Sequence, residues 1–278
     1  IEHPGELSDV PPGCVPVLQV VTPVPQLQLG QVSAAAGRVA GDAVTWAARA
    51  ALAGEVAAIV TAPLHKAALA AGGFEFPGHT ELLQWEAARY LGCGVDQVPV
   101  RMMLANDELR TVLVSIHVSL RQAIEAVTFD GVLQTLRIAH AALSRALGRL
   151  PRMAVAGLNP HAGEGGLFGS VEQTIIAPAI DAARAEGIRA SGPYAPDTVF
   201  MRARRGEFDA VIAMYHDQGL IPVKYLGVEK GVNVTLGLPL VRTSPDHGTA
   251  FDLAGTGRAD AASLIEAIRV ARSLIRPA

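Results

Sequence analysis

Ala210-Val211-Ile212-Ala213-Met214-Tyr215-His216 is one of three short apolar runs in this 278-residue chain that lead to a histidine. The others are TVLVSIH at 111–117 and MAVAGLNPH at 153–161. Short apolar runs that alternate with helical segments are typical of buried parallel strands. Ligands in open α/β sheets bind beyond the carboxyl ends of the strands, so three imidazoles are expected at one edge of the sheet. They predict an enzyme with a divalent-metal site and an open position for substrate. The predicted ligands are His117, His161 and His216.

A plainer interpretation is that each histidine is hydrogen-bonded in its own polar loop. For any one of them this is the favoured interpretation, but all three share one topological position, which favours a common site. Asp217 adjoins His216, and Asp197 lies in the segment APDT at 195–198. Either carboxylate could orient an imidazole or assist proton transfer. Three imidazoles suit Zn²⁺, Co²⁺ or Ni²⁺ comparably well, so the metal stays open.

The composition is that of a compact globular protein, with half of the residues hydrophobic and a mean hydropathy of +0.31. The net charge of −3 gives no electrostatic reason to expect nucleic acid or a membrane as a partner. No apolar stretch reaches the roughly 18 residues of a membrane span, and no signal peptide is visible. The two cysteines, Cys14 and Cys93, match no disulfide framework or metal-ligand spacing, so a cytoplasmic location is expected.

Strand-like and helix-like segments alternate along the chain, which predicts an α/β fold. Strands are expected at 56–62, 100–105, 111–116, 153–158, 210–215 and 232–236, with a turn at Asn106-Asp107. Helices are expected at 33–53, 63–72, 80–91, 120–127, 130–148, 170–186, 198–205 and 261–275. Residues 1–30 are expected to form loops and an edge strand over 15–22.

Two groups of residues are candidates for binding an anion. Gly78-His79-Thr80 opens a predicted helix, where free backbone N–H groups and the helix dipole favour phosphate. Lys224, Asn233 and Arg242 lie in a later stretch rich in Gly and Pro; Arg binds phosphate as a bidentate fork and Lys as a point charge. From the residues alone, an ordinary helix cap and solvated surface charges remain the favoured interpretation.

Two loops are dense in small residues. NPHAGEGG at 159–166 follows a predicted strand, so a phosphate-bearing ligand could approach its backbone, but it matches neither G-x-G-x-x-G nor a Walker A sequence. HGTAFDLAGTG at 247–257 is a shaped loop, for which a simple turn before the last helix is the alternative.

Several ordered blocks closely resemble the 4-hydroxythreonine-4-phosphate dehydrogenase family of pyridoxal-phosphate biosynthesis. They are TAPLHK at 61–66, GHTE at 78–81, LNPHAGEGG at 158–166, MYHDQG at 214–219, and GVNVTLGLP at 231–239 running on through Arg242 to HGTA at 247–250. The resemblance covers roughly residue 30 to the end of the chain.

The resemblance implies an isocitrate/isopropylmalate dehydrogenase-like fold, with two α/β/α domains flanking a cleft, in a homodimer with a shared active site. Residues 1–78 and 222–278 would form the cofactor-side α/β domain that carries both termini. Residues 79–221 would form the central domain for metal binding and dimerisation.

The resemblance also implies roles for individual residues. The three histidines named above match the metal ligands, one of them supplied across the dimer interface, and His161 and Asp197 match catalytic residues. The substrate-binding set, mainly around a phosphate, is matched by His79, Thr80, Lys224, Asn233 and Arg242. The adenine-side loop of isocitrate and isopropylmalate dehydrogenases is matched by His247, Gly248, Thr249, Ala250 and Asp252. Such a loop binds a nicotinamide cofactor without a Rossmann fingerprint.

The activity implied is the oxidation of 4-hydroxythreonine 4-phosphate with NAD or NADP and one divalent metal (Zn²⁺, Co²⁺ or Mg²⁺), followed by decarboxylation of the 2-amino-3-oxo acid phosphate. Alternatives are a paralogue that oxidises threonate or erythronate 4-phosphate or a cis-dihydrodiol, and a catalytically silent binding paralogue. The family opens with a strand and a GDPAGIGPE-like loop that this sequence lacks. The missing segment is the only feature that favours the silent paralogue. We expect that it is missing because the sequence is truncated.

Overall fold

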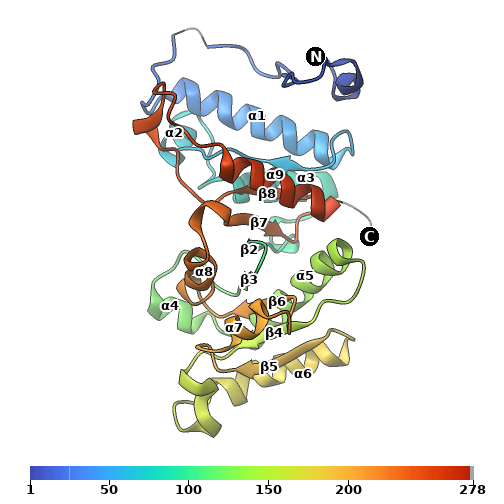
Figure 1. Ribbon diagram of the computed structural model, residues 1–278, viewed down its shortest axis with the longest axis vertical. Coiled ribbons are helices and arrows are strands. Elements are labelled where there is room, and N and C mark those ends of the chain that lie inside the picture. Colours follow the sequence, from blue (N-terminus) through green and yellow to red (C-terminus); the bar gives the residue numbers. More distant parts are fainter. Residues whose placement is uncertain (25, 276–278) are drawn as a thin grey trace.

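The computed structural model describes residues 1–24 and 26–275 and is built around one eight-stranded sheet (Figure 1). The strand order is β1-β8-β7-β2-β3-β6-β4-β5. The strands are β1 (Ile59–Val60), β2 (Arg101–Ala105), β3 (Arg110–Leu113), β4 (Met153–Ala156), β5 (Ala190–Tyr194), β6 (Ala210–Ala213), β7 (Val232–Leu236) and β8 (Arg242–Pro245). The predicted α/β class is confirmed as a mixed α/β fold with a central sheet.

The strand directions place the three predicted histidines at one edge of the sheet. β3, β6 and β4 are neighbours and run parallel, so their carboxyl ends meet at the same edge, as predicted. β5 extends this parallel set, whereas β2 is antiparallel to both β3 and β7. The predicted turn joins β2 to β3, because the Asn106 Oδ1 accepts hydrogen bonds from the N–H groups of Glu108 and Leu109.

Helices cover both faces of the sheet (Figure 1). They are α1 (Ala34–Leu52), α2 (Lys66–Ala71), α3 (His79–Leu91), α4 (Leu120–Glu125), α5 (Phe129–Leu147), α6 (Ala177–Ala185), α7 (Val199–Arg204), α8 (His216–Tyr225) and α9 (Ala262–Ile275). Capping side chains explain where several helices begin: Ser33 caps α1, Ser119 forms a capping box with Gln122 in α4, and Thr128 caps α5. Gly148 ends α5 at φ 63°, a conformation that favours glycine.

Alternate residues of the strands pack into different clusters. In β6, Ala210 and Ile212 pack with α5 and α6, whereas Val211 and Ala213 pack with α7 and α8. A third cluster joins α1, α3, Ile59 and Leu238. The division into 1–78 with 222–278 and 79–221 stays a prediction; in the structure, α3 packs with α1 and the sheet is continuous through β2 and β3.

Three predicted features differ from the structure. The edge strand over 15–22 is wrong: this segment is irregular, and Val15 and Val17 are 85% and 69% exposed. The helix expected from 63 begins at Lys66. The helix expected over 170–186 begins with a π-helical turn at Glu172–Ile176 before α6.

Three elements of the structure, β5, α8 and β8, were not predicted from the sequence. Gly219 and Pro222 lie inside α8 and are poor helix formers, so the local pattern hides this helix. Gly219 is required by packing, because a Cβ there would lie 2.4 Å from Leu113 Cδ2. Along the described part of the chain, no helix is both long enough and apolar enough to cross a bilayer.

Candidate active site

A cavity of about 210 Å³ brings together four of the five predicted substrate residues. It lies beside β7 and β2 and at the amino end of α3, and its lining includes His79, Thr80, Asn233 and Arg242. Lys66 and His117 also line it. The first residue before α3, Gly78, has no side chain to cap the helix, so the N–H groups of the first turn remain available to an anion.

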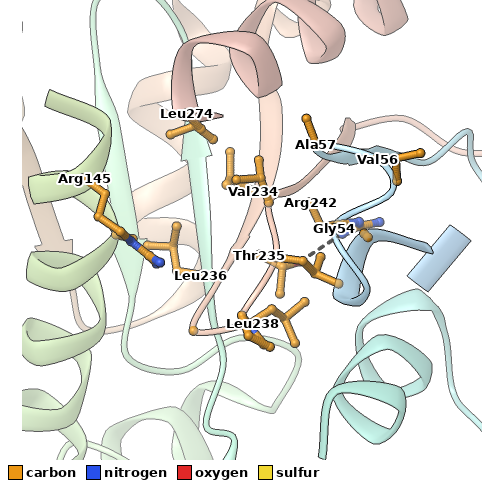
Figure 2. Close-up of a pocket in the computed structure, with 16 residues that line it drawn as sticks. Gly54, Val56, Ala57, Arg145, Val234, Thr235, Leu236, Leu238, Arg242 and Leu274 are labelled. Atoms are coloured by element: carbon orange, nitrogen blue, oxygen red, sulfur yellow. Dashed lines mark hydrogen bonds between the residues drawn. The ribbon is translucent and has the colours of Figure 1, made fainter. Parts of the chain in front are cut away.

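Arg242 is the buried cation of this cavity, with 5% of its surface exposed. Its guanidinium donates to two neutral hydroxyls, Thr235 Oγ1 at 3.1 Å and Thr61 Oγ1 at 2.8 Å. Figure 2 shows the bond to Thr235. The buried Nε has no hydrogen-bond partner among the residues that the structure describes. Burial lowers the Arg242 pKa to about 10, so the side chain stays positive at neutral pH and fits an anionic ligand.

His79 is a neutral neighbour of this cation. Its burial, together with the charge of Arg242, lowers the His79 pKa to about 4. A neutral imidazole has one donor and one acceptor nitrogen, so His79 can donate a hydrogen bond to a ligand oxygen without adding charge.

Lys224, the fifth predicted substrate residue, makes an ion pair in the structure. Its Nζ lies 2.8 Å from Asp246 Oδ2, and Asp246 precedes the loop that begins at His247. This contact fixes the ammonium beside the loop predicted to bind the cofactor. A ligand phosphate there would compete with a carboxylate for the Lys224 charge.

The side chains of two of the three predicted metal ligands lie close together. The rings of His117 and His216 have centroids 5.5 Å apart. Burial, and then the charge of His216, lowers the His117 pKa, which favours the neutral imidazole that binds metals. His216 Nδ1 lies 2.7 Å from Asp217 Oδ1, so a proton on Nδ1 leaves Nε2 free as a ligand. Each of these two imidazoles therefore has a nitrogen available as a donor to a divalent metal, which needs further ligands to complete its coordination.

His161, the third predicted ligand, lies in a different cavity of about 750 Å³ with Asp197 and Asp217. Its ring packs near Phe168, with centroids 6.1 Å apart. Over the described ranges 1–24 and 26–275, no group of three or more His, Cys, Asp or Glu side chains is placed to hold a metal. One folded chain therefore brings two of the three histidines together.

The predicted cofactor loop lies against the segment that precedes α2. Its Phe251 ring stacks on His65, with centroids 5.3 Å apart and planes inclined by 20°. His247 Nδ1 lies 2.9 Å from Gly248 O, and Ala250 adopts φ 45°. Because Lys66, the next residue after His65, lines the substrate cavity, this stacking places the loop beside that cavity.

Another cavity, of about 350 Å³, lies on the face of the sheet covered by α5 and α9 (Figure 2). Its lining is mainly apolar and includes Val234, Leu236 and Leu274, with Arg145 from α5. It shares Arg242 with the substrate cavity.

Three residues that the structure places at these sites were not predicted from the sequence. Lys66 and Glu81 line the substrate cavity, and both stand in blocks that carry the family resemblance. Glu172 is 2% exposed and accepts hydrogen bonds from Leu158 and Asn159, just before His161. Burial raises the pKa of the Glu172 carboxyl, but these hydrogen bonds outweigh burial and hold it below its usual value. A Glu inside a predicted helix carries no local signal of burial.

A profile of the family described as "Pyridoxal phosphate biosynthetic protein PdxA" matches residues 3–271. The chain belongs to the PdxA family. PdxA relatives include the 4-hydroxythreonine-4-phosphate dehydrogenase of Beijerinckia indica, 59% identical over 250 residues that cover 90% of this chain and 72% of that protein. The D-threonate 4-phosphate dehydrogenase of Salmonella typhimurium is 46% identical over 264 residues, covering 95% and 78%.

The fold agrees with this assignment. The crystal structure of 4-hydroxythreonine-4-phosphate dehydrogenase from Klebsiella pneumoniae superimposes with a TM-score of 0.81 at 46% identity, covering 90% of this chain and 73% of that one. Because the PdxA relatives are dehydrogenases, this chain is assigned to the oxidoreductases that act on a CH–OH group.

Proposed function

We propose that the chain oxidises 4-hydroxythreonine 4-phosphate with NAD or NADP in the biosynthesis of pyridoxal 5'-phosphate. The observation that carries the proposal is Arg242, a buried cation with neutral hydroxyl partners and a free Nε donor at the substrate cavity. A phosphate supplies acceptor oxygens that this group lacks, and it adds negative charge to that of Glu81, which already favours the charged guanidinium. The substrates named for the two relatives above both carry a 4-phosphate.

In this proposal the phosphate end of the substrate is held by the chain's own side chains and the start of α3. Arg242 neutralises the charge, neutral His79 and Thr80 donate single hydrogen bonds, and Asn233 contributes an amide beside them. Holding one end of the substrate orients the hydroxyl carbon for reaction and lowers the entropy lost on reaching the transition state. Lys224 would leave Asp246 to join the phosphate or stay paired beside the cofactor loop.

We assign the metal to His117, His216 and His161, with Asp217 orienting His216. A bound Zn²⁺, Co²⁺ or Mg²⁺ would lower the pKa of the substrate hydroxyl, and the nicotinamide of NAD or NADP would accept the hydride. Asp197 takes the hydroxyl proton, so one hydride and one proton leave the CH–OH group and a ketone forms. The product would be a 2-amino-3-oxo acid phosphate, which loses its carboxylate as CO₂; the bonding electrons stay on the carbon that carried it, and that carbon takes up a proton.

We further propose that the site is shared in a homodimer, so that His161 and Asp197 of a second copy complete the site of the first. The support is a set of exposed apolar side chains beside each histidine. Ile116 and Val118 flank His117, and Leu167, next to Phe168, is 74% exposed. Ile221 and Tyr225, 63% and 90% exposed, lie on α8, which begins at His216. Large exposed apolar groups of this kind mark protein interfaces.

The second candidate is oxidation of threonate or erythronate 4-phosphate. It is favoured by the 46% identity to the Salmonella typhimurium D-threonate 4-phosphate dehydrogenase. The substrate cavity recognises the phosphate, which both candidates share, and not the group that distinguishes an amino acid from a sugar acid. A cis-dihydrodiol carries no phosphate, and only one that bears a carboxylate offers Arg242 an anion, which makes this alternative the weaker one. We keep the cytoplasm as the proposed location, in line with the free cysteines Cys14 and Cys93.

The test is NAD⁺ or NADP⁺ reduction at 340 nm with 4-hydroxythreonine 4-phosphate, threonate 4-phosphate and erythronate 4-phosphate, each with and without a chelator. Chelator-sensitive turnover of the amino acid phosphate is expected. Turnover only of the sugar-acid phosphates would assign the protein to the second candidate. Unphosphorylated 4-hydroxythreonine is added to the series, and its turnover at the same KM as the phosphate would contradict the role of Arg242.

A further inference from the structure

The turn that carries His161 has an uncommon backbone. Six consecutive residues, His161 to Gly166, have positive φ values between 43° and 103°. Three of them, His161, Ala162 and Glu164, carry a Cβ, which makes this left-handed conformation unfavourable. Such a turn persists only when the surrounding structure holds it in place.

Glu172 makes the contacts that hold this turn. Its Oε1 accepts hydrogen bonds from the N–H groups of Leu158 at 2.8 Å and Asn159 at 2.7 Å. Its Oε2 accepts from Asn159 Nδ2 at 3.0 Å. The carboxylate therefore fixes both residues that precede Pro160 and His161. It can accept all three bonds because an ionised carboxylate is an acceptor at both oxygens.

The turn also closes tightly over this carboxylate. A Cβ on Gly163 would lie 2.8 Å from Glu172 Oε2, and a Cβ on Gly157 would lie 2.8 Å from Ala162 Cα. Glu172 itself begins the π-helical turn Glu172–Ile176. Single π-turns inside helices are frequent at functional sites. The carboxylate is 2% exposed, so water does not replace it as the acceptor for these donors.

We propose that Glu172 is a positioning residue for His161: its carboxylate sets the left-handed turn that presents the imidazole to the active site. The inference rests on the proposed role of His161 as a metal ligand. Glu172 acts through the backbone of Leu158 and Asn159, and it touches neither substrate nor cofactor in this proposal. Replacing a group that orients a metal ligand typically lowers metal affinity about 10- to 100-fold.

The test compares Glu172→Gln with wild type as full-length protein. The Gln side chain has one acceptor oxygen and an NH₂ group that cannot accept from Asn159 or Leu158. We expect the affinity of the metal-free protein for Zn²⁺, measured by competition with a chromophoric chelator, to fall about 10- to 100-fold. We also expect a changed absorption spectrum of the Co²⁺ form and faster hydrogen exchange at the Leu158 and Asn159 amides. At saturating metal, kcat falls while KM for the phosphorylated substrate stays the same, because Arg242 lies in another cavity.

Three controls separate positioning from general stability and from failure of the proposed function. Leu143→Ala, in the buried core of α5, should lower Tm without changing Zn²⁺ affinity or the Co²⁺ spectrum. Asn159→Ala removes only the contact to Oε2 and serves as the milder variant if Glu172→Gln does not fold; it should weaken Zn²⁺ binding less. His161→Ala should weaken Zn²⁺ binding at least as much as Glu172→Gln.

The outcomes are distinct. Wild-type Zn²⁺ affinity, spectrum and amide exchange in Glu172→Gln, with loss of binding in His161→Ala, would overturn the role of Glu172 and leave the proposed function standing. Unchanged Zn²⁺ binding in His161→Ala would overturn the metal assignment itself, and the role of Glu172 with it. A loss of affinity in Leu143→Ala equal to that in Glu172→Gln would show that stability, and not positioning, controls metal binding.

Discussion

The cavity around Arg242 and the turn around His161 both lie near strand ends, but they are held in different ways. Arg242 belongs to strand β8 and is bonded to hydroxyls on β7 and just after β1. His161 stands in a left-handed turn that depends on one buried carboxylate. One folded chain therefore brings four of the five predicted substrate residues to one cavity. The predicted metal ligands are divided between two cavities of that chain.

The largest expected effect tests this division directly. His161→Ala and His117→Ala should each abolish turnover, because each removes one of three predicted metal ligands. If His161 acts across the dimer interface, mixing the two inactive variants should restore activity, since a mixed dimer has one intact site. Random pairing gives about one quarter of wild-type activity. The measurement is turnover after co-refolding or co-expression; no recovery would place all three ligands in the same protomer.

The next effect concerns the cavity around Arg242. Arg242→Ala should raise KM for a phosphorylated substrate about 100-fold, because a buried charge-assisted bond to phosphate is lost. Arg145→Ala is the matched control, an exposed arginine on α5 at the rim of the neighbouring cavity (Figure 2). It should leave KM unchanged. Steady-state kinetics that gave both variants the same KM would remove Arg242 from substrate binding.

A pH experiment sharpens the description of the same cavity. The His79 pKa is about 4 in the folded protein and near 6.5 when unfolded, so the unfolded chain binds more protons between these values. Stability should therefore fall on acidification from pH 7 to pH 4.5, and His79 accounts for about 2 kcal/mol of that fall. Urea unfolding of wild type and His79→Gln at both pH values measures it. Equal losses in the two proteins would show that His79 is not the titrating group.

The smallest expected effect lies on the metal side. Asp217→Asn keeps the size of the side chain but removes the charge that faces His216 Nδ1. We expect Zn²⁺ affinity to fall about 10-fold, with KM for the phosphate end of the substrate unchanged. Isothermal titration of the metal-free protein measures the affinity. A raised KM with unchanged metal affinity would instead place Asp217 in substrate binding.

Several elements could be predicted because their signals are local. The runs that became β3, β4 and β6 are apolar and bounded by Gly, Pro or polar residues. The helices that begin at Ala34 and Phe129 follow capping residues and have one apolar face. β8 was missed because it begins with Arg242, and a charged residue is a poor sign of a buried strand. The charge there is hydrogen-bonded to hydroxyls of Thr235, on the neighbouring strand, and of Thr61, from a distant part of the chain.

The sequence alone determined the α/β alternation and the placement of three histidines just beyond parallel strands, because strand length, apolar runs and helix caps are properties of neighbouring residues. Tertiary structure decided which of these groups meet. The bond between Arg242 and Thr61 joins residues 181 positions apart. Tertiary structure also placed His117 beside His216, left His161 in another cavity, and buried Glu172 beneath the turn. Each of these depends on packing between segments that no local pattern relates.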